Sequence, residues 1–417
     1  MYKVSEYNYC VDYHNDLKIV FNTFSGAIVS MSNAEYSRLM DLSACTDVEL
    51  ETLLSVGLVI PINHDVKRVI DFNRASRIFS NKKQTYTILT TTNCNARCFY
   101  CYEKEIPNCS MTVDVANGVS DFISSKATDK STIDIQWFGG EPLLNPVVID
   151  EIVYKLQQFN LKPNYSMITN GLLFDEKMLQ HSLNNNWNIK RVQITLDGDK
   201  EEYENRKQYI NASSAFERVL SNISGLLEHS INISVRLNFD KNNVDSIIRA
   251  VDILEECFGG YKNFSCYAYP LFSTYEKTMH EQLENDKMLL ELWNVLISRN
   301  LYKIKIPSYR QTNCYACNAN SFVIHPSGDL FKCSMDLANK VGNVDSAKIK
   351  NSTLVDWCDV NLSEECNKCI FLPLCQGGCK AGKSGIAPVH CFLEKNVIDD
   401  LLKMYYEERI LNKVRKK

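Results

Sequence analysis

The chain has 417 residues, which exceeds one ordinary domain and predicts two or three, each with its own core. Its formal net charge of -4 provides no broad basic field for nucleic acid, and the basic run Lys413–Lys417 is interpreted as a solvated tail. No uninterrupted apolar stretch approaches the roughly 18 residues of a membrane span, and the first residues lack the apolar core of a signal peptide. The sequence therefore predicts a cytoplasmic protein without nucleic-acid or membrane partners.

Seventeen cysteines are distributed unevenly along the chain. Three lie within eight residues, between Cys94 and Cys101, and nine lie between Cys314 and Cys391, of which only Cys358 falls outside any motif spacing. Cytosolic thiols are not normally held as structural disulfides, so these groups indicate metal or redox chemistry. The other five are expected to be small buried hydrophobic residues: Cys10, Cys45, Cys109, Cys257 and Cys266.

Residues 1–80 predict a small separate module. Its three strands are expected at Asn8–Tyr13, Leu17–Asn22 and Ala27–Ser30. Two helices are expected at Asn33–Leu42 and Asp47–Val56, with capping boxes formed by Ser32 with Glu35 and by Thr46 with Glu49. This order resembles the PqqD-like recognition element, a winged-helix-like module that binds the leader of a ribosomally made precursor peptide by strand addition. A generic capping domain is the alternative.

From Tyr86 to about Pro270, strand-like and helical segments alternate. The six strands are expected at Tyr86–Thr91, Ile133–Phe138, Tyr165–Thr169, Arg191–Leu196, Ile233–Phe239 and Phe264–Tyr269. Such alternation predicts an α/β fold with a parallel sheet, here a partial (β/α)6 TIM barrel over residues 81–275. Polar and glycine-bearing segments follow the strands, at the end of the sheet where α/β barrels assemble their sites. Residues 276–310 are expected to be a charged linker, with Met279–Ser298 in helical period.

A C-x3-C-x2-C loop follows the first of these strands, with thiols at Cys94, Cys98 and Cys101. Three thiolates on one short loop can hold three corners of a four-iron cube, which leaves one iron open for a substrate or cofactor. Zinc sites usually pair two C-x2-C units, and this loop lacks their fourth ligand. The spacing, with the aromatic Tyr100 before the last cysteine, resembles the radical SAM superfamily.

Short motifs after the later strands add to that resemblance, although each alone is also compatible with an ordinary turn. Gly139, Gly140 and Glu141 look like the family's Gly-Gly-Glu-Pro turn, which implies close approach of the backbone to the methionine amino group of SAM. Thr195 and Arg206 stand where the family contacts SAM with a hydroxyl and pairs its carboxylate with an arginine. The remaining implied cofactor contacts are Tyr100, Asn170, Leu237 and Asn238.

Eight further cysteines surround an expected hairpin of Phe322–His325 with Leu330–Cys333. Their spacing resembles the SPASM domain, here residues 311–395, followed by a helix and basic tail over residues 396–417. The resemblance implies two auxiliary four-iron clusters, whereas short C-x2-C units alone also suit zinc ribbons. The implied ligands are Cys314, Cys317, Cys333 and Cys379 for the first cluster, and Cys366, Cys369, Cys375 and Cys391 for the second. The sequence does not decide whether Cys314 or Cys317 is an exchangeable ligand.

Together these resemblances imply a radical SAM/SPASM maturase of a ribosomally synthesised peptide, with three 4Fe-4S clusters and SAM as cofactors. The cluster on the Cys94 loop is expected to reduce SAM and release a 5'-deoxyadenosyl radical, which removes hydrogen from the substrate. The N-terminal module favours thioether formation between a cysteine sulfur and a carbon, as in sactipeptides and ranthipeptides. Carbon-carbon crosslinking, epimerisation and sulfatase maturation by formylglycine formation remain alternatives, as does a non-catalytic iron-sulfur or zinc protein that binds a peptide. The expected partners are the precursor peptide, bound through its leader, and an electron donor such as flavodoxin or ferredoxin.

Overall fold

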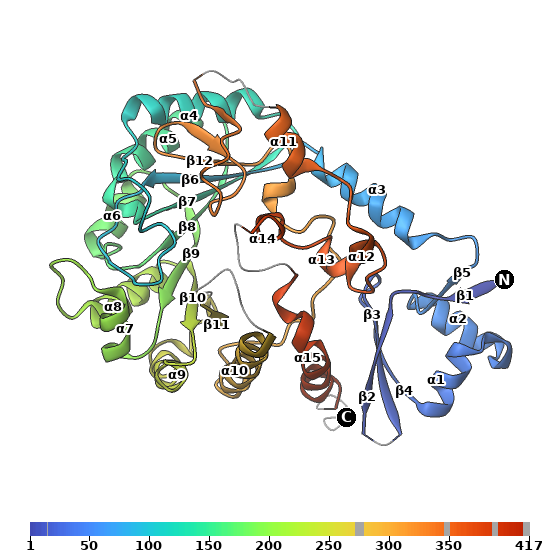
Figure 1. Cartoon of the computed structure of the whole chain (residues 1–417). Helices are drawn as coiled ribbons and strands as arrows, with labels where there is room; N and C mark the ends of the chain where they lie inside the picture. Colours follow the sequence, from blue (N-terminus) through green and yellow to red (C-terminus); the bar gives the residue numbers. More distant parts are fainter. Residues whose placement is uncertain (15, 272–278, 346–350, 386–390, 412–417) are drawn as a thin grey trace. The chain divides into compact units, whose positions relative to one another are not determined.

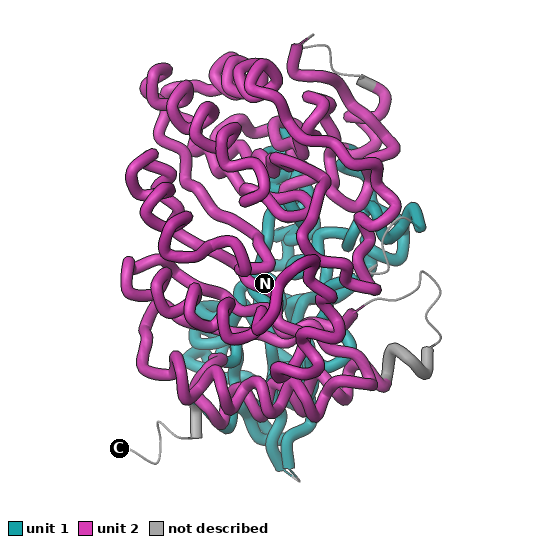
Figure 2. The backbone as a smooth tube through the Cα atoms, turned by 90° about the vertical axis from the view of Figure 1, so that its left-hand side faces the viewer, with its two compact units in different colours: residues 1–79, 304–314, 359–417 teal, residues 80–303, 315–358 magenta. Residues whose placement is uncertain are grey.

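The computed structural model describes residues 1–14, 16–271, 279–345, 351–385 and 391–411, so the basic run predicted as a tail lies outside the described residues. The chain forms two compact units (Figure 2). Unit 1 comprises residues 1–79, 304–314 and 359–417, and unit 2 comprises residues 80–303 and 315–358. This division differs from the predicted one, because the N-terminal module shares a unit with the end of the chain and the cysteine-rich region is split between both units.

Unit 2 is built on six parallel strands, which confirms the predicted α/β fold (Figure 1). Each strand pairs with the next one along the chain, as expected when a helix connects successive strands. Their bounds agree closely with the predicted ones: β6 Lys83–Thr91, β7 Thr132–Gly139, β8 Asn164–Thr169, β9 Ile189–Leu196, β10 Asn232–Phe239 and β11 Phe264–Pro270.

Helices connect these strands and surround the sheet from outside (Figure 1). They are α4 Val113–Lys126, α5 Pro146–Gln158, α6 Glu176–Asn184, α7 Lys200–Lys207, α8 Ala215–Glu228, α9 Val244–Phe258 and the predicted α10 Met279–Ser298. Strand side chains such as Trp137 and Val235 are fully buried, whereas the alternate positions, such as Gln136 and Arg236, are half-buried. The strand period of two thus gives the sheet an apolar outer face and a more polar inner face. No helix in the described part of the chain is both long and apolar enough to cross a membrane.

The predicted hairpin does not stand apart from the barrel but extends its sheet. β12 Phe322–Ile324 pairs in parallel with β6, and β13 Asp329–Phe331 and β14 Gly342–Asn343 follow as antiparallel neighbours. The seam is apolar, with Leu89, Val323 and Phe331 in one buried cluster. The first half of the predicted SPASM region is therefore continuous with the barrel sheet.

Unit 1 contains the predicted N-terminal strands and helices. β2 Asn8–Tyr13, β3 Leu17–Asn22 and β4 Ile28–Ser32 form an antiparallel sheet in that order, while β1 Tyr2–Val4 pairs with β5 Val59–Pro61. The two predicted capping boxes, at Ser32 and Thr46, begin α1 Asn33–Met40 and α2 Asp47–Ser55. The remaining helices are α3 Val66–Ile78, α12 Glu364–Asn367, α13 Leu372–Cys375, α14 Lys380–Lys383 and α15 Ile398–Tyr405.

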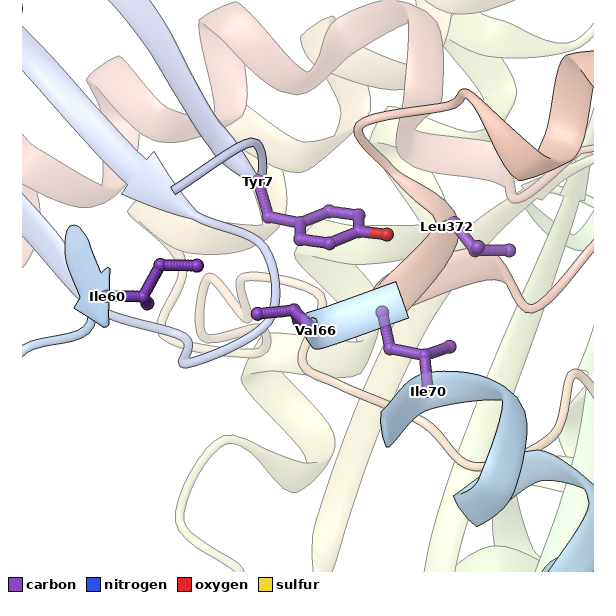
Figure 3. Close-up of a cluster of buried hydrophobic side chains, with 5 residues drawn as sticks. All are labelled: Tyr7, Ile60, Val66, Ile70 and Leu372. Atoms are coloured by element: carbon purple, nitrogen blue, oxygen red, sulfur yellow. The ribbon is translucent and has the colours of Figure 1, made fainter. Parts of the chain in front are cut away.

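One buried apolar cluster joins the two ends of the chain within unit 1 (Figure 3). It consists of Tyr7, Ile60, Val66 and Ile70 from the N-terminal part, and Leu372 from α13. The Thr23 hydroxyl also donates a hydrogen bond to the Ile370 carbonyl at 2.6 Å. Since removing the N-terminal residues would return this apolar surface to water, they are not expected to be dispensable for folding of the rest of unit 1.

Candidate functional site

The cysteine loop leaves the sheet at the carboxyl end of β6 and is held by the chain that follows α7. The Arg97 N–H donates to the Lys207 carbonyl at 2.8 Å, and the Ile210 N–H donates to the Asn95 carbonyl at 2.8 Å. Gln208 ends α7 in the left-handed conformation, with a φ of 48°, and so turns the chain out of the helix. These two backbone hydrogen bonds fix the loop beside the end of α7.

Amide groups point at the sulfur atoms of this loop. The Ala96 N–H donates to Cys94 Sγ at 3.4 Å, Asn170 Nδ2 lies 4.0 Å from the same sulfur, and the backbone N–H of Glu103 bonds the Cys101 sulfur. Burial raises the pKa of Cys94 to about 11, and the Ala96 donor opposes that shift because it stabilises the thiolate. Iron-sulfur ligands are thiolates, so these surroundings fit the predicted ligand role.

The three thiols of the loop lie close enough to one another that Cys98 and Cys101 raise the pKa of Cys94. No three Cys, His, Asp or Glu side chains among the described residues are placed to hold a single metal ion. A structural zinc site gathers four ligands around one ion, whereas a four-iron cube takes one thiolate at each of several corners. A four-iron cluster on these three thiols therefore stays a prediction.

The Gly-Gly-Glu-Pro turn after β7 packs on the start of the cysteine loop. The Gly140 N–H donates to the Thr91 carbonyl at 3.0 Å, and the Glu141 N–H donates to the Asn93 carbonyl at 2.9 Å. A Cβ atom on Gly139 would lie 2.1 Å from the Thr91 oxygen, and one on Gly140 would lie 2.3 Å from the Asn93 oxygen. Both positions thus require glycine, because the two backbones approach so closely that no side chain fits.

Glu141 is fully buried and ties the end of β7 to the end of β8. Its carboxylate accepts hydrogen bonds from the Thr169 hydroxyl at 2.8 Å and from the Asn170 N–H at 2.9 Å. Burial raises the pKa of Glu141 to about 7, although these donors favour the ionised form. Asn170 in turn donates to the Asn95 side chain at 2.7 Å. The predicted residues Glu141 and Asn170 are therefore brought together beside the cysteine loop.

Tyr100 belongs to a buried polar network that the sequence did not predict. Its hydroxyl donates to Asp197 Oδ2 at 2.5 Å, and Lys207 Nζ lies 2.8 Å from the same hydroxyl. Lys207 also forms an ion pair with Asp197 at 3.1 Å and donates to the Thr195 hydroxyl at 3.0 Å. Asp197 is fully buried and Lys207 is 3% exposed. The predicted residues Tyr100 and Thr195 thus meet through an unforeseen ion pair.

Arg206 and Asn238 have partners other than those implied by the family resemblance. The Arg206 guanidinium binds both oxygens of Asp240, at 2.8 and 3.1 Å, and its Nε donates to Glu202. Asn238 donates to Asp197 Oδ1 at 3.0 Å, while the neighbouring Leu237 is fully buried. In this structure Arg206 is therefore neutralised by carboxylates of its own chain.

Three of the four cysteines predicted to hold the second auxiliary cluster are close to one another in unit 1. Cys391 accepts a hydrogen bond from Cys375, which lowers the pKa of Cys391 and raises that of Cys375. The charge of Cys366 raises the pKa of Cys375 further. Lys383 Nζ lies 3.4 Å from Cys366 Sγ, and Lys395 Nζ lies 3.7 Å from Cys391 Sγ. Nearby ammonium groups stabilise thiolates, so this surrounding also fits metal ligands.

The four cysteines predicted for the first auxiliary cluster are divided between the units. Cys314 and Cys379 belong to unit 1, and Cys317 and Cys333 belong to unit 2. Within unit 1, the Asn313 side chain donates to the Gly378 carbonyl at 2.7 Å, which brings together the segments that precede Cys314 and Cys379. The complete ligand set of this cluster stays a prediction.

Comparison with known proteins agrees with this geometry. Residues 88–254 match the Radical SAM superfamily. The chain is 23% identical over 357 residues to the cysteine-type anaerobic sulfatase-maturating enzyme of Clostridium novyi (strain NT), covering 77% of this chain and 93% of the relative. It is 32% identical over 127 residues to the radical SAM cyclopropyl synthase TigE of Paramaledivibacter caminithermalis (strain DSM 15212 / CIP 107654 / DViRD3), covering 26% of each protein.

Two solved structures share the fold. Native anSMEcpe with bound AdoMet and Cp18Cys peptide aligns with a TM-score of 0.60 at 17% identity, covering 80% of this chain and 99% of the other. Streptococcus suis SuiB bound to the precursor peptide SuiA aligns with a TM-score of 0.53 at 13% identity, covering 91% of this chain and 95% of the other. The match over residues 88–254 shows that the chain carries a radical SAM domain, and the two solved structures show that it shares their fold.

Proposed function

We propose that this enzyme modifies a ribosomally synthesised precursor peptide and links a cysteine sulfur to a carbon of another residue. The observation that carries the proposal is the edge strand β4 of unit 1, which offers a peptide a place to dock in the same chain as a radical SAM domain. The likeness to SuiB bound to its precursor peptide supports a peptide substrate. All seventeen cysteines are free thiols, which supports a reducing cytoplasmic compartment.

In this proposal Cys94, Cys98 and Cys101 hold a 4Fe-4S cluster, which supplies the electron that cleaves SAM when both are bound. The bonds from Lys207 and Ile210 fix the loop that presents these thiolates. SAM is proposed to contact the predicted residues Tyr100, Gly139, Gly140, Glu141, Asn170, Thr195, Arg206, Leu237 and Asn238. Arg206 would bind the SAM carboxylate only by exchanging Asp240 or Glu202 for it.

The eight cysteines from 314 to 391, without Cys358, are proposed to hold two auxiliary 4Fe-4S clusters that accept the electron left on the product. Flavodoxin or ferredoxin is proposed as the source of the electron that starts the cleavage of SAM. In this proposal Lys383 and Lys395 help to neutralise the ligand thiolates of the second auxiliary cluster.

β4 is proposed as the docking strand for the leader peptide. It is an edge of the three-stranded sheet, with no further strand paired to its outer side among the described residues. The other edge, β2, contacts the C-terminal helix, where the Tyr9 hydroxyl donates to Asp399 at 2.6 Å. A peptide that adds a strand can therefore use the main-chain groups of β4.

The hydrogen-bond ladder between β3 and β4 identifies which groups remain for such a peptide. At its two ends, the Asn22 N–H donates to the Ala27 carbonyl at 2.9 Å, and the Asn33 N–H donates to the Asp16 carbonyl at 3.2 Å. Bonded and non-bonded pairs alternate along an antiparallel ladder, and Ser30 falls at a non-bonded position of the register. The Ser30 N–H therefore points away from β3.

Replacing Ser30 by proline should reduce affinity for the precursor peptide about 10-fold or more, because the substitution removes a main-chain donor from the outer edge only. The control is Ser30→Ala, which keeps that N–H and should bind like the parent. Binding is measured by fluorescence anisotropy with the labelled precursor, and peptide-free SAM cleavage should be unchanged in both variants. Equal affinity of the proline and alanine variants would remove β4 as the docking strand.

Thioether formation should remove two hydrogen atoms from the peptide for each crosslink and should protect the participating cysteine from alkylation. Mass spectrometry of the precursor after anaerobic turnover, with and without iodoacetamide, measures both changes. Loss of hydrogen with every thiol still alkylatable would indicate carbon-carbon crosslinking, and a product of unchanged mass would indicate epimerisation.

Sulfatase maturation is the second candidate, favoured by the sequence similarity over 93% of the length of the Clostridium novyi enzyme. In that reaction a cysteine loses its sulfur and becomes an aldehyde, formylglycine. Incubation with a cysteine-containing sulfatase peptide should then yield a product that reacts with hydrazides. A protein that forms no 5'-deoxyadenosine under reduction would contradict both enzymatic candidates and leave a non-catalytic iron-sulfur protein.

A further inference from the structure

The inner face of the barrel carries a polar surface on its last three strands. Tyr267 on β11 donates from its hydroxyl to the Gln193 side chain on β9 at 3.0 Å. That bond reaches across β10, so side chains at alternate positions of all three strands lie on one face. Arg236 of β10 is in register with Thr195 on one side and Tyr267 on the other. The side chains of Gln193, Thr195, Arg236 and Tyr267 are only half-buried, so the surface is accessible from inside the barrel.

Arg236 is held in one orientation at this surface. Its guanidinium carbon lies 3.8 Å from the centroid of the Tyr269 ring, and its Nε donates to Asn238 Oδ1 at 2.9 Å. Burial raises the pKa of Tyr267, and the Arg236 charge opposes this shift. Arg236 also forms a side-chain hydrogen bond with Tyr267. A guanidinium has five N–H donors, so these bonds leave others for a carboxylate, which it can bind with two hydrogen bonds.

The charge of Arg236 is not neutralised by an ion pair with any described residue. The carboxylate closest in the network is Asp197, which Asn238 separates from Arg236 and which already pairs with Lys207 at 3.1 Å. The carboxylate nearest to Arg236 in this network is therefore already paired with Lys207. A half-buried guanidinium with excess positive charge attracts an anionic ligand more strongly than an exposed one, because less water screens the interaction.

This surface adjoins the cysteine loop. Thr195, the neighbour of Arg236 in the register, accepts a hydrogen bond from Lys207, and Lys207 bonds the hydroxyl of Tyr100. Adjacent strands are separated by about 4.8 Å, so Arg236 lies one strand from the network that includes the loop. A ligand held at Arg236 is therefore close to the proposed site of SAM cleavage.

We propose that Arg236 binds a carboxylate of the peptide substrate, contributed by an acidic side chain near the residue that is modified. This inference rests on the proposed function as a peptide-modifying enzyme. In this proposal, β10 and β11 select which residue of the peptide is modified, whereas β4 binds the leader. The carboxylate of SAM is the competing occupant of this position. The two possibilities are distinguished by measuring the KM for the peptide and the dissociation constant for SAM separately.

The test uses the full-length, cluster-reconstituted enzyme with the precursor peptide encoded beside its gene. Arg236→Gln should raise the KM for this peptide about 10- to 100-fold, the loss expected for a charge-assisted hydrogen-bonded pair. Its SAM dissociation constant and its peptide-free formation of 5'-deoxyadenosine should stay within about 2-fold of the parent values. The KM of Arg236→Lys should fall between those of the parent and of Arg236→Gln, because an ammonium keeps the charge but not the paired donors. Arg249→Gln, at an exposed arginine paired with Asp199, is the matched control and should leave the KM unchanged.

Peptides in which each acidic residue is changed singly to its amide complete a double-mutant cycle. At one of these positions, the change to the amide should raise the KM of the parent enzyme but should not raise that of Arg236→Gln any further, since both changes remove the same interaction. Additive losses at every position, or an unchanged KM, would overturn the inference, as would a fall in SAM affinity with peptide affinity retained. A parent enzyme that forms 5'-deoxyadenosine but alters no peptide would instead refute the proposed function, and the inference with it.

Discussion

Replacing Cys94, Cys98 and Cys101 together by alanine should abolish SAM cleavage and remove about a third of the iron, one cluster of the proposed three. These thiols are the only cysteines on the loop that the 207–210 segment fixes at the end of β6. Iron and sulfide are measured on anaerobically purified protein, and 5'-deoxyadenosine is measured after reduction.

Cys257→Ala is the matched control, because Cys257 is exposed on α9 and belongs to no cysteine motif. It should retain all iron and full SAM cleavage. Iron loss in the triple variant without loss of 5'-deoxyadenosine would place the reactive cluster on other cysteines. Full iron retention would mean that the loop holds no cluster.

Replacing Lys207 by methionine should destabilise unit 2 by about 3 to 5 kcal/mol, because it leaves the fully buried carboxylate of Asp197 without its counter-ion. The same change removes a donor from Tyr100 and Thr195, so we also expect slower or incomplete cluster reconstitution. Thermal unfolding of the apo protein and iron content after reconstitution measure the two effects.

Two variants control for this effect. The double change Lys207→Met with Asp197→Asn removes both charges and should recover most of the lost stability. Lys200→Met, on the same helix but with an exposed ion pair to Glu217, should leave stability close to that of the parent, because solvent screens an exposed pair. A double variant that is less stable than Lys207→Met alone would show that the ion pair is not what makes Lys207 necessary.

Local sequence patterns predicted those parts of the fold that depend on neighbouring residues. The six strands and α10 appear where the periodicity placed them, and both capping boxes form because their partners are three residues apart, at Ser32 with Glu35 and at Thr46 with Glu49. The Gly-Gly-Glu-Pro turn was recognised as a motif, but the reason for its glycines, contact with the Thr91 and Asn93 carbonyls, is a property of two segments that meet only in the fold.

The contacts that the sequence did not reveal have a common physical cause. Lys207 stands in a strongly charged helix, α7, where a sequence pattern indicates a solvated face, and only the fold shows that Asp197 accompanies it into the interior. Arg206 matched the family pattern by spacing, yet spacing does not reveal the carboxylate of Asp240 beside it. The predicted N-terminal domain boundary ignored Leu372, because nothing local in the sequence connects that residue to Tyr7.

The pairing of β12 with β6 has a consequence for how the protein is made. The Thr85 N–H donates to the Ser321 side chain across a separation of 236 residues, so β6 emerges from the ribosome long before its outer neighbour exists. At translation rates of about 5 to 20 residues per second, this interval lasts on the order of 10 to 50 seconds. During that time β6, with Tyr86, Ile88 and Leu89, presents an unpaired apolar edge of the kind that nucleates aggregation. We therefore expect the nascent barrel to depend on chaperones until β12 is synthesised, and chains that terminate before Phe322 to accumulate as insoluble protein.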